Sequence, residues 1–147
     1  MTIYFDMDGT IADLYSTADW LNRLRAYDPR PYIEARPLVN MSSLARLLNN
    51  LQDNGYSIGI ISWGSKESNK TFDRAIARMK LAWLRRHLPS VNFNVEHIVP
   101  YGTRKSIFMD DGDILFDDEK RNREDWINHG GIAFDVDNIL NVLKGLK

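Results

Sequence analysis

Thr2-Ile3-Tyr4-Phe5-Asp6-Met7-Asp8-Gly9-Thr10 decides the fold, because an apolar run here ends in two carboxylates that are followed at once by a glycine. In an extended segment alternate side chains point the same way, so Asp6 and Asp8 can face one small volume. Two like charges held this close repel each other unless a cation or a shared proton compensates them. An Asp-x-Asp pair alone is also typical of a solvated turn. The Gly9-Thr10 pair and the position on the first strand favour an active site at the end of a strand over 2–6.

Short apolar runs alternate with segments of helical periodicity along the rest of the chain. Helices are expected over 14–25, 42–54, 67–87, 119–129 and 138–145, and further strands over 56–62, 94–99, 113–116 and 132–136. Because each strand is a nearly continuous apolar run between helices, we expect a parallel sheet covered on both faces. The sequence therefore predicts an α/β fold, a Rossmann-like three-layer sandwich of about five strands, in a single domain over 1–147.

The composition excludes several classes of site and partner. The net charge of −1 gives no reason to expect nucleic acid or an anionic membrane as a partner, although it leaves room for a local basic patch. The absence of cysteine excludes disulfides and thiolate metal sites, and His87, His97 and His129 are not at zinc-ligand spacing. No apolar run approaches the roughly 20 residues of a membrane span, and the first strand leaves no room for a signal peptide. We therefore expect a cytoplasmic location.

Polar residues stand where the predicted strands end. In open α/β sheets ligands gather at the carboxyl ends of the strands. The residues in question are Asp6 and Asp8 after the first strand, Ser62 at the end of the second, Lys105 between the third and fourth, and Asp117 and Asp118 after the fourth. Their order along the chain predicts one site assembled from four segments.

This order resembles the four signatures of the haloacid dehalogenase (HAD) superfamily of phosphatases and phosphotransferases, over about residues 2–136. Asp6 to Thr10 resembles the first signature, Ser62 the second and Lys105 the third, and Asp113 to Asp118 resembles the fourth. The resemblance implies a HAD-like fold with Asp6 as the nucleophile that forms an aspartyl-phosphate. It also implies that Asp8 is the general acid and base, and that its backbone carbonyl binds the metal.

The same resemblance implies a set of phosphate-binding groups. Gly9 and Thr10 would let the backbone turn so that amides face the phosphate. The Ser62 hydroxyl would hydrogen-bond a phosphoryl oxygen, helped by the amides of Trp63 and Gly64. Lys105 would neutralise the phosphoryl charge, and its position favours it over four competing cations. These competitors are Lys66, Lys70, Lys80 and Arg104.

Mg²⁺ is the expected cofactor, because it takes oxygen ligands in octahedral geometry. Its ligands are expected from Asp6, Asp8, Asp117 and Asp118, with Asp118 favoured over Asp117 for direct contact. The stretch Ile107 to Asp111 is a rival for the last pair, because it also reads as apolar residues ending in two aspartates. The later pair is favoured because a helix and a Gly-Gly pair follow it. Asp110-Asp111-Gly112 looks like an ordinary turn.

The insert over 13–41 bears on the substrate, because members of this superfamily choose substrates largely through cap insertions. Here the cap is minimal, which suits a large substrate with an exposed phosphate or closure by the second subunit of a homodimer. Aromatic residues could stack on a base and arginines could bind further phosphates: Trp20, Tyr27, Tyr32 and Trp63, and Arg23, Arg25, Arg30 and Arg36. The alternative is that the aromatic residues pack and the arginines are solvated. Local similarity of the last signature to 5′(3′)-deoxyribonucleotidases makes a nucleotide the favoured small phosphorylated substrate.

The sequence thus predicts a Mg²⁺-dependent phosphatase that hydrolyses a phosphate monoester through an aspartyl-phosphate. One alternative is a regulatory or binding domain that holds phospho-aspartate without turnover. Asp8 discriminates between the two, because a receiver-type domain has no acid or base two residues after its phosphoacceptor. A polynucleotide-end phosphatase is a further alternative.

Overall fold

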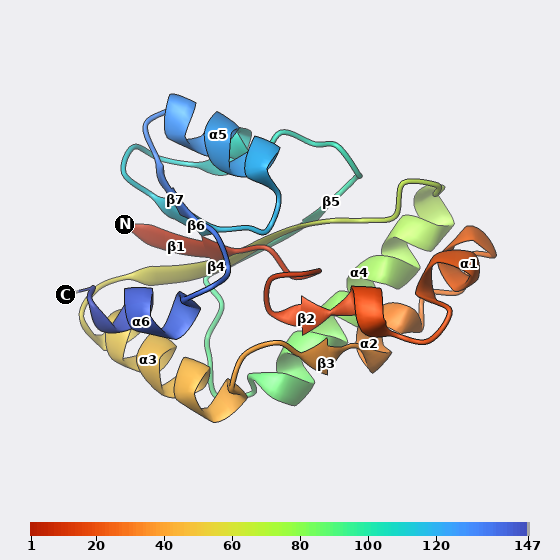
Figure 1. Cartoon of the computed structure of the whole chain (residues 1–147), viewed down its shortest axis with the longest axis horizontal. Coiled ribbons are helices and arrows are strands. Elements are labelled where there is room, and N and C mark those ends of the chain that lie inside the picture. Colours follow the sequence, from red (N-terminus) through yellow and green to blue (C-terminus); the bar gives the residue numbers. More distant parts are fainter. Residues whose placement is uncertain (147) are drawn as a thin grey trace.

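A five-stranded parallel sheet lies at the centre of the computed structural model, which describes residues 1–146 (Figure 1). The strand order is β5-β4-β1-β6-β7, and every neighbouring pair runs parallel. The strands are β1 (Thr2–Phe5), β4 (Ser57–Trp63), β5 (Val95–Val99), β6 (Ile114–Phe116) and β7 (Ile132–Phe134). The predicted α/β class and the parallel sheet of about five strands are therefore confirmed.

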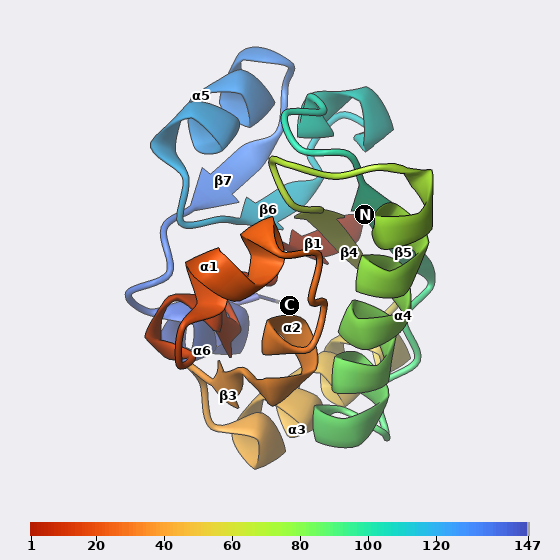
Figure 2. The ribbon, with the colours of Figure 1, turned by 90° about the vertical axis from the view of Figure 1, so that its right-hand side faces the viewer.

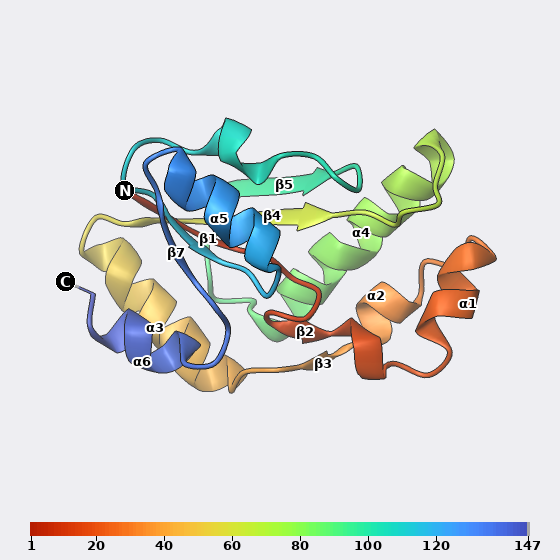
Figure 3. The same cartoon turned by 45° about the horizontal axis from the view of Figure 1, so that its top comes forward.

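Helices cover both faces of this sheet (Figures 1 and 3). They are α3 (Met41–Asp53), α4 (Lys70–His87) and α6 (Ile139–Lys144) on one face, and α5 (Lys120–Asn128) with the 3₁₀ turn η2 (Lys105–Phe108) on the other. Asparagine side chains cap α3 and α4: Asn40 accepts from the Ser43 amide and Asn69 from the Phe72 amide. Within residues 1–146, no helix has the length and apolar character needed to cross a bilayer.

Alternation along β1 divides the core between the two faces. Ile3 and Phe5 pack into the larger cluster, and the Phe5 ring stacks on Phe116 with 5.0 Å between centroids. Tyr4 faces the other side, where its ring meets Trp126 of α5 edge-on at 5.5 Å. The alternation places every second residue on one face, as the extended backbone requires.

Gly59 in the middle of β4 gives a test of this packing. It lies opposite Tyr4 in the ladder, and a Cβ at this position would come within 2.7 Å of two atoms of the Tyr4 ring. Gly59→Ala is therefore expected to lower the free energy of unfolding by about 1–3 kcal/mol, because the buried ring cannot move without disturbing its neighbours. Urea denaturation would measure this loss. Gly145→Ala is the control, since its Cβ would make ordinary contacts of 3.4 Å or more, and equal stability of the two variants would contradict the prediction.

The insert between β1 and α3 lies at the carboxyl ends of the strands (Figure 2). It contains β2 (Ala12–Asp13), the 3₁₀ turn η1 (Leu14–Ser16), α1 (Trp20–Arg25), α2 (Pro31–Glu34) and β3 (Arg36–Pro37). The β2 and β3 strands pair in antiparallel fashion at the base of the insert.

The single helix predicted over 14–25 was wrong. The Asp13 side chain accepts from the Ser16 amide and its carbonyl accepts from the Thr17 hydroxyl, and such local bonds compete with a helix. Asp19 then takes a left-handed conformation with φ of 53°, so α1 begins anew at Trp20. The α2 helix and the β3 strand then form over residues 31–37, where neither a helix nor a strand was predicted.

Candidate functional site

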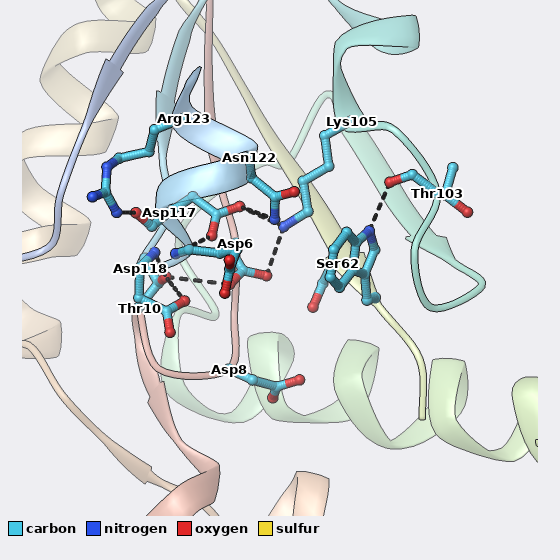
Figure 4. A network of polar contacts seen from close by, with 12 residues as sticks. Asp6, Asp8, Thr10, Ser62, Thr103, Lys105, Asp117, Asp118, Asn122 and Arg123 are labelled. Carbon is cyan, nitrogen blue, oxygen red and sulfur yellow. Dashed lines mark hydrogen bonds and ion pairs between the residues drawn. The ribbon is translucent and has the colours of Figure 1, made fainter. Parts of the chain in front are cut away.

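A cavity of about 320 Å³ lies at the carboxyl edge of the sheet, beside the insert. Its lining includes the aspartates that follow β1 and β6, together with Lys105 at the start of η2. The β1 and β6 strands are neighbours in register, with Phe5 opposite Phe116, so the residues that follow them are brought together. Figure 4 shows Asp6, Lys105, Asp117 and Asp118 pointing toward one another.

Asp6 and Lys105 form a buried ion pair facing this cavity. The Lys105 Nζ lies 3.0 Å from Asp6 Oδ1, and its side chain is 2% exposed. Burial alone would raise the pKa of Asp6, but the ammonium groups of Lys105 and Lys80 outweigh burial and hold this pKa below its usual value. Asp6 is therefore an ionised carboxylate with its charge partly balanced, which is the state a carboxylate nucleophile requires.

Asp117 is held by a full set of hydrogen bonds. Its Oδ2 accepts from Lys105 Nζ at 2.7 Å and from the Asn122 amide at 3.1 Å, and its Oδ1 accepts from the Glu119 amide at 2.9 Å. Burial, with a contribution from the Asp6 charge, raises the pKa of Asp117 to about 6. Both carboxylate oxygens of Asp117 therefore accept hydrogen bonds from protein groups, which leaves this carboxylate less available to a ligand in the cavity.

Asp118 is the freer member of the pair. The Thr10 hydroxyl lies 3.2 Å from Asp118 Oδ1 and 3.3 Å from Asp6 Oδ2, and so connects the two carboxylates. Burial and the neighbouring Asp6 raise the pKa of Asp118 to about 8. Such a rise shows that the ionised form lacks a partner cation.

The three carboxylates fit a divalent cation. Asp6, Asp117 and Asp118 each offer an oxygen, and these oxygens lie within 4.8 Å of one another. With Asp8 added, four buried or half-buried carboxyl groups lie beside two ammonium groups, Lys80 and Lys105, so the full ionisation that a bound cation would favour leaves two negative charges for that cation to balance. Oxygen ligands and this charge suit a hard cation.

Gly9 and Thr10 form the turn after the first strand, but their amides have other partners. Gly9 has a φ of 76°, and its N–H donates to the Ala12 carbonyl, while the Thr10 N–H donates to the Met7 carbonyl. The expectation that these amides face a phosphate therefore finds no support in this geometry. Gly9 is instead needed for its positive φ and because a Cβ would come within 2.5 Å of Asp118.

Asp8 points away from the carboxylate cluster and toward α4. Its Oδ2 accepts from the Lys80 Nζ at 2.8 Å, and the same ammonium donates to the Ser62 hydroxyl oxygen at 2.7 Å. Burial raises the pKa of Asp8 above its usual value, although Lys80 acts against this rise. Ser62 is fully buried and is absent from the cavity lining, so its predicted contact with phosphate stays a prediction.

Trp63 lies in the cavity wall through its side chain. The indole N–H donates to the Thr103 carbonyl at 2.8 Å, and the ring lies 5.4 Å from Lys105 Nζ and packs on Tyr101. The Gly64 amide, expected to assist at the phosphate, donates to the Val99 carbonyl instead. In this structure, Lys105 is therefore the predicted phosphate-binding residue whose charged group both lines the cavity and contacts Asp6.

The rival aspartate pair is not at the site. The segment that contains Ile107 forms η2 rather than a strand, and Asp111-Gly112 is a turn with Gly112 at a φ of 83°. Asp117 and Asp118, rather than Asp110 and Asp111, lie beside Asp6, and their role as metal ligands stays a prediction.

The insert contributes fewer ligand-facing groups than its composition suggested. Trp20 and Arg25 line the cavity, but the Tyr27 ring packs edge-on against Phe72 at 5.1 Å. Arg23 is bonded to Asp28 and Glu34, and Arg30 is bonded to Asp28. Packing and ion pairing thus account for Tyr27, Arg23 and Arg30 among the aromatic and arginine residues singled out in the insert.

A second hollow of about 520 Å³ adjoins the first across Trp63 and Tyr101. Arg104 and Arg121 lie in its wall; Arg104 is paired with Asp125 at 2.7 Å. Within the part of the chain that the structure describes, the Arg121 side chain has no hydrogen bond or ion pair. The two hollows together form a surface longer than a single phosphate group.

The fold has a counterpart among solved structures. D,D-heptose 1,7-bisphosphate phosphatase from Burkholderia thailandensis matches with a TM-score of 0.59 and 14% identity, covering 99% of each chain. The HAD domain of the effector protein Lem4 from Legionella pneumophila matches with a TM-score of 0.41 and 14% identity, covering 91% of this chain and 83% of that one; this likeness is too weak to bear on the fold. No protein-family model and no curated protein matches the sequence. The first likeness shows that this chain shares its fold with that phosphatase, in agreement with the predicted α/β class.

Proposed function

We propose that this protein is a Mg²⁺-dependent phosphatase that hydrolyses phosphate monoesters through a phosphorylated Asp6. The observation that carries the proposal is the position of the Asp6 carboxylate. It faces the cavity with Lys105 at 3.0 Å on one side and the Asp117 and Asp118 carboxylates on the other. A nucleophile between a fixed cation and a metal site is the arrangement that phosphoryl transfer to a carboxylate needs.

In the first step an Asp6 oxygen attacks the phosphorus, the bond from phosphorus to the leaving-group oxygen breaks, and that oxygen takes a proton from Asp8. In the second step Asp8 takes a proton from water as the water oxygen attacks phosphorus. The bond from phosphorus to Asp6 then breaks and releases inorganic phosphate. Lys105 offsets the negative charge beside Asp6 throughout.

Asp6 and Asp118 would hold the Mg²⁺ through their carboxylates, with the Asp8 backbone carbonyl as a further ligand. Asp117 would support the metal site from the outer shell, because its oxygens accept hydrogen bonds from Lys105, Asn122 and the Glu119 amide. When bound, Mg²⁺ supplies positive charge opposite the negative charge of the transferring phosphoryl group.

A nucleotide is the favoured substrate. Aromatic side chains from both sides of the cavity support this choice, because a planar base can stack on them: Tyr15, Trp20, Trp63 and Tyr101. The structurally similar phosphatase is one for D,D-heptose 1,7-bisphosphate, which makes a sugar phosphate the comparison class. Closure of the cavity by a second subunit stays a prediction.

A polynucleotide end is a second candidate substrate, and the second hollow favours it. A chain longer than one nucleotide could continue across the Trp63–Tyr101 pair, where Arg121 is available for the next phosphate.

Phosphate release from a substrate panel tests the proposed function. The panel contains nucleoside monophosphates, sugar phosphates and oligonucleotides phosphorylated at the 5′ or 3′ end, each assayed with Mg²⁺ and with EDTA. We expect Mg²⁺-dependent release that EDTA abolishes and that readdition of Mg²⁺ restores, with the preferred member naming the substrate class. Release that is insensitive to EDTA would contradict the metal-dependent mechanism. Silence of the folded protein across the panel would favour a domain that binds or retains phosphate without turnover.

A further inference from the structure

Lys80 is a buried lysine on the core-facing side of α4. Its side chain is 1% exposed, and it stands among the buried residues Phe72, Ile76, Trp83 and Leu84 of the same helix. A lysine is almost never fully buried unless it is paired, because removing the ammonium group from water is costly. Its place in the core therefore calls for specific partners.

The three protons of its ammonium group have three acceptors. Lys80 Nζ donates to Asp8 Oδ2 at 2.8 Å, to Ser62 Oγ at 2.7 Å and to the Trp63 carbonyl at 2.6 Å. The Tyr32 ring of α2 lies over the same nitrogen, 4.7 Å from it, and helps to separate it from water. One residue thus connects β4, α4, the insert and the loop that carries Asp8.

Lys80 does not itself reach a bound phosphate. The cavity lining includes Lys105 and Asp8 but not Lys80. The two buried lysines therefore have different tasks, since Lys105 contacts the Asp6 nucleophile and Lys80 contacts Asp8. Any effect of Lys80 on the reaction must pass through the groups that it holds.

We propose that Lys80 is a positioning residue for proton transfer, which fixes Asp8 by one oxygen so that the other is presented to the leaving group. The inference rests on the proposed function. Lys80 takes Oδ2 of Asp8, while Oδ1 has no hydrogen bond among residues 1–146 and belongs to a carboxylate in the cavity wall. The bonds to Ser62 and Trp63 anchor the ammonium to the end of β4, so the Asp8 side chain is connected to the sheet through Lys80.

The dependence of the rate on the leaving group distinguishes a residue that positions the general acid from one that only supplies positive charge near the phosphoryl group. When the bond from phosphorus to the ester oxygen breaks, an alkoxide leaves poorly without a proton, whereas 4-nitrophenolate is stable without one. Displacing the general acid therefore slows alkyl esters much more than 4-nitrophenyl esters. Loss of positive charge near the phosphoryl group slows both, because the charge on that group is common to them.

The experiment compares kcat/KM for 4-nitrophenyl, phenyl and ethyl phosphate in the wild type, Lys80→Met and Lys105→Met. For Lys80→Met we expect a loss of about 100-fold or more on ethyl phosphate and a loss of less than about 10-fold on 4-nitrophenyl phosphate, with phenyl phosphate between them. For Lys105→Met we expect a similar loss on all three. A uniform loss in Lys80→Met, or no loss, would overturn the inference.

Lys80→Gln keeps the test decisive if Lys80→Met does not fold, because an amide can still donate to Ser62 and Trp63 but carries no charge to hold Asp8. The same graded losses are expected, and circular dichroism would establish that the variant is folded. If the wild type hydrolyses none of the three esters and none of the wider panel, the proposed function fails. If the wild type hydrolyses them and the Lys80 variants lose activity uniformly, this inference alone fails.

Discussion

Asp6→Asn is expected to abolish phosphate release, with a loss in kcat of at least about 10⁴-fold, as for removal of other covalent nucleophiles. The amide has nearly the same shape as the carboxylate but cannot form an acyl phosphate. The variant should remain folded, because Lys105 keeps its bond of 2.7 Å to Asp117. Phosphate release under saturating substrate and Mg²⁺ would measure the loss, and circular dichroism would verify the fold.

Asp53→Asn is the matched control, since Asp53 is an exposed carboxylate at the end of α3 and lies outside the cavity lining. It should retain the wild-type rate. A covalent readout complements the rate: in Asp8→Asn the second step lacks its base, so an acid-quenched reaction with 4-nitrophenyl phosphate should contain protein phosphorylated on Asp6. The covalent mechanism would be contradicted if the Asp6→Asn protein hydrolysed the best substrate within tenfold of the wild-type rate.

The carboxylate cluster could be predicted from the sequence because strand order alone brings it together. Asp6 follows β1 and Asp117 follows β6, and parallel neighbours end at the same edge of the sheet. Two apolar runs that end in aspartates, together with the resemblance to the HAD signatures, predicted that these residues share one site. Lys105 could be placed as well, because it lies just before the last of these runs.

Backbone partners and side-chain directions could not be predicted in the same way. The amides of Gly9, Thr10 and Gly64 were expected at a phosphate, but each donates to a carbonyl of a nearby loop or strand. Such bonds depend on the path of the turn, which residue type alone does not determine. The break at Asp19 has the same origin, since local side-chain bonds outweighed a helical periodicity of only a few leucines.

Lys80 is the functional residue whose role could not be assigned from the sequence, although the signal was present. Ile76 and Trp83 are large apolar residues of the helix predicted over 67–87, and Lys80 lies four residues after the first and three before the second. Positions at this spacing share one helix face, so a lysine there predicts a buried charge. A buried charge in turn predicts acceptors at the nearest strand end, which are the Ser62 hydroxyl and Asp8.

Asp118→Asn is expected to remove the stabilisation of the protein by Mg²⁺ and to lower kcat/KM by at least about 100-fold. Loss of an outer-shell partner already costs a metal site about 10–100-fold in affinity, and Asp118 is proposed as a direct ligand. Wild-type protein at a free Mg²⁺ concentration 100 times its Kd should gain about 2.7 kcal/mol of stability. Thermal unfolding with and without Mg²⁺ would show this gain in the wild type and its absence in the variant.

The metal-free variant gives the sharper distinction between a metal ligand and a structural residue. In the metal-free protein, burial and the neighbouring Asp6 raise the pKa of Asp118 and so disfavour its ionised form. Asn has nearly the same shape and no charge, so metal-free Asp118→Asn should unfold at the same temperature as the metal-free wild type or at a higher one. Asp111→Asn is the control, because this exposed aspartate belongs to the rival pair and lies in a turn. It should keep both the activity and the Mg²⁺-dependent shift. Loss of the Mg²⁺-dependent shift in unfolding temperature in Asp111→Asn, or its persistence in Asp118→Asn, would contradict a metal site at the carboxyl ends of β1 and β6.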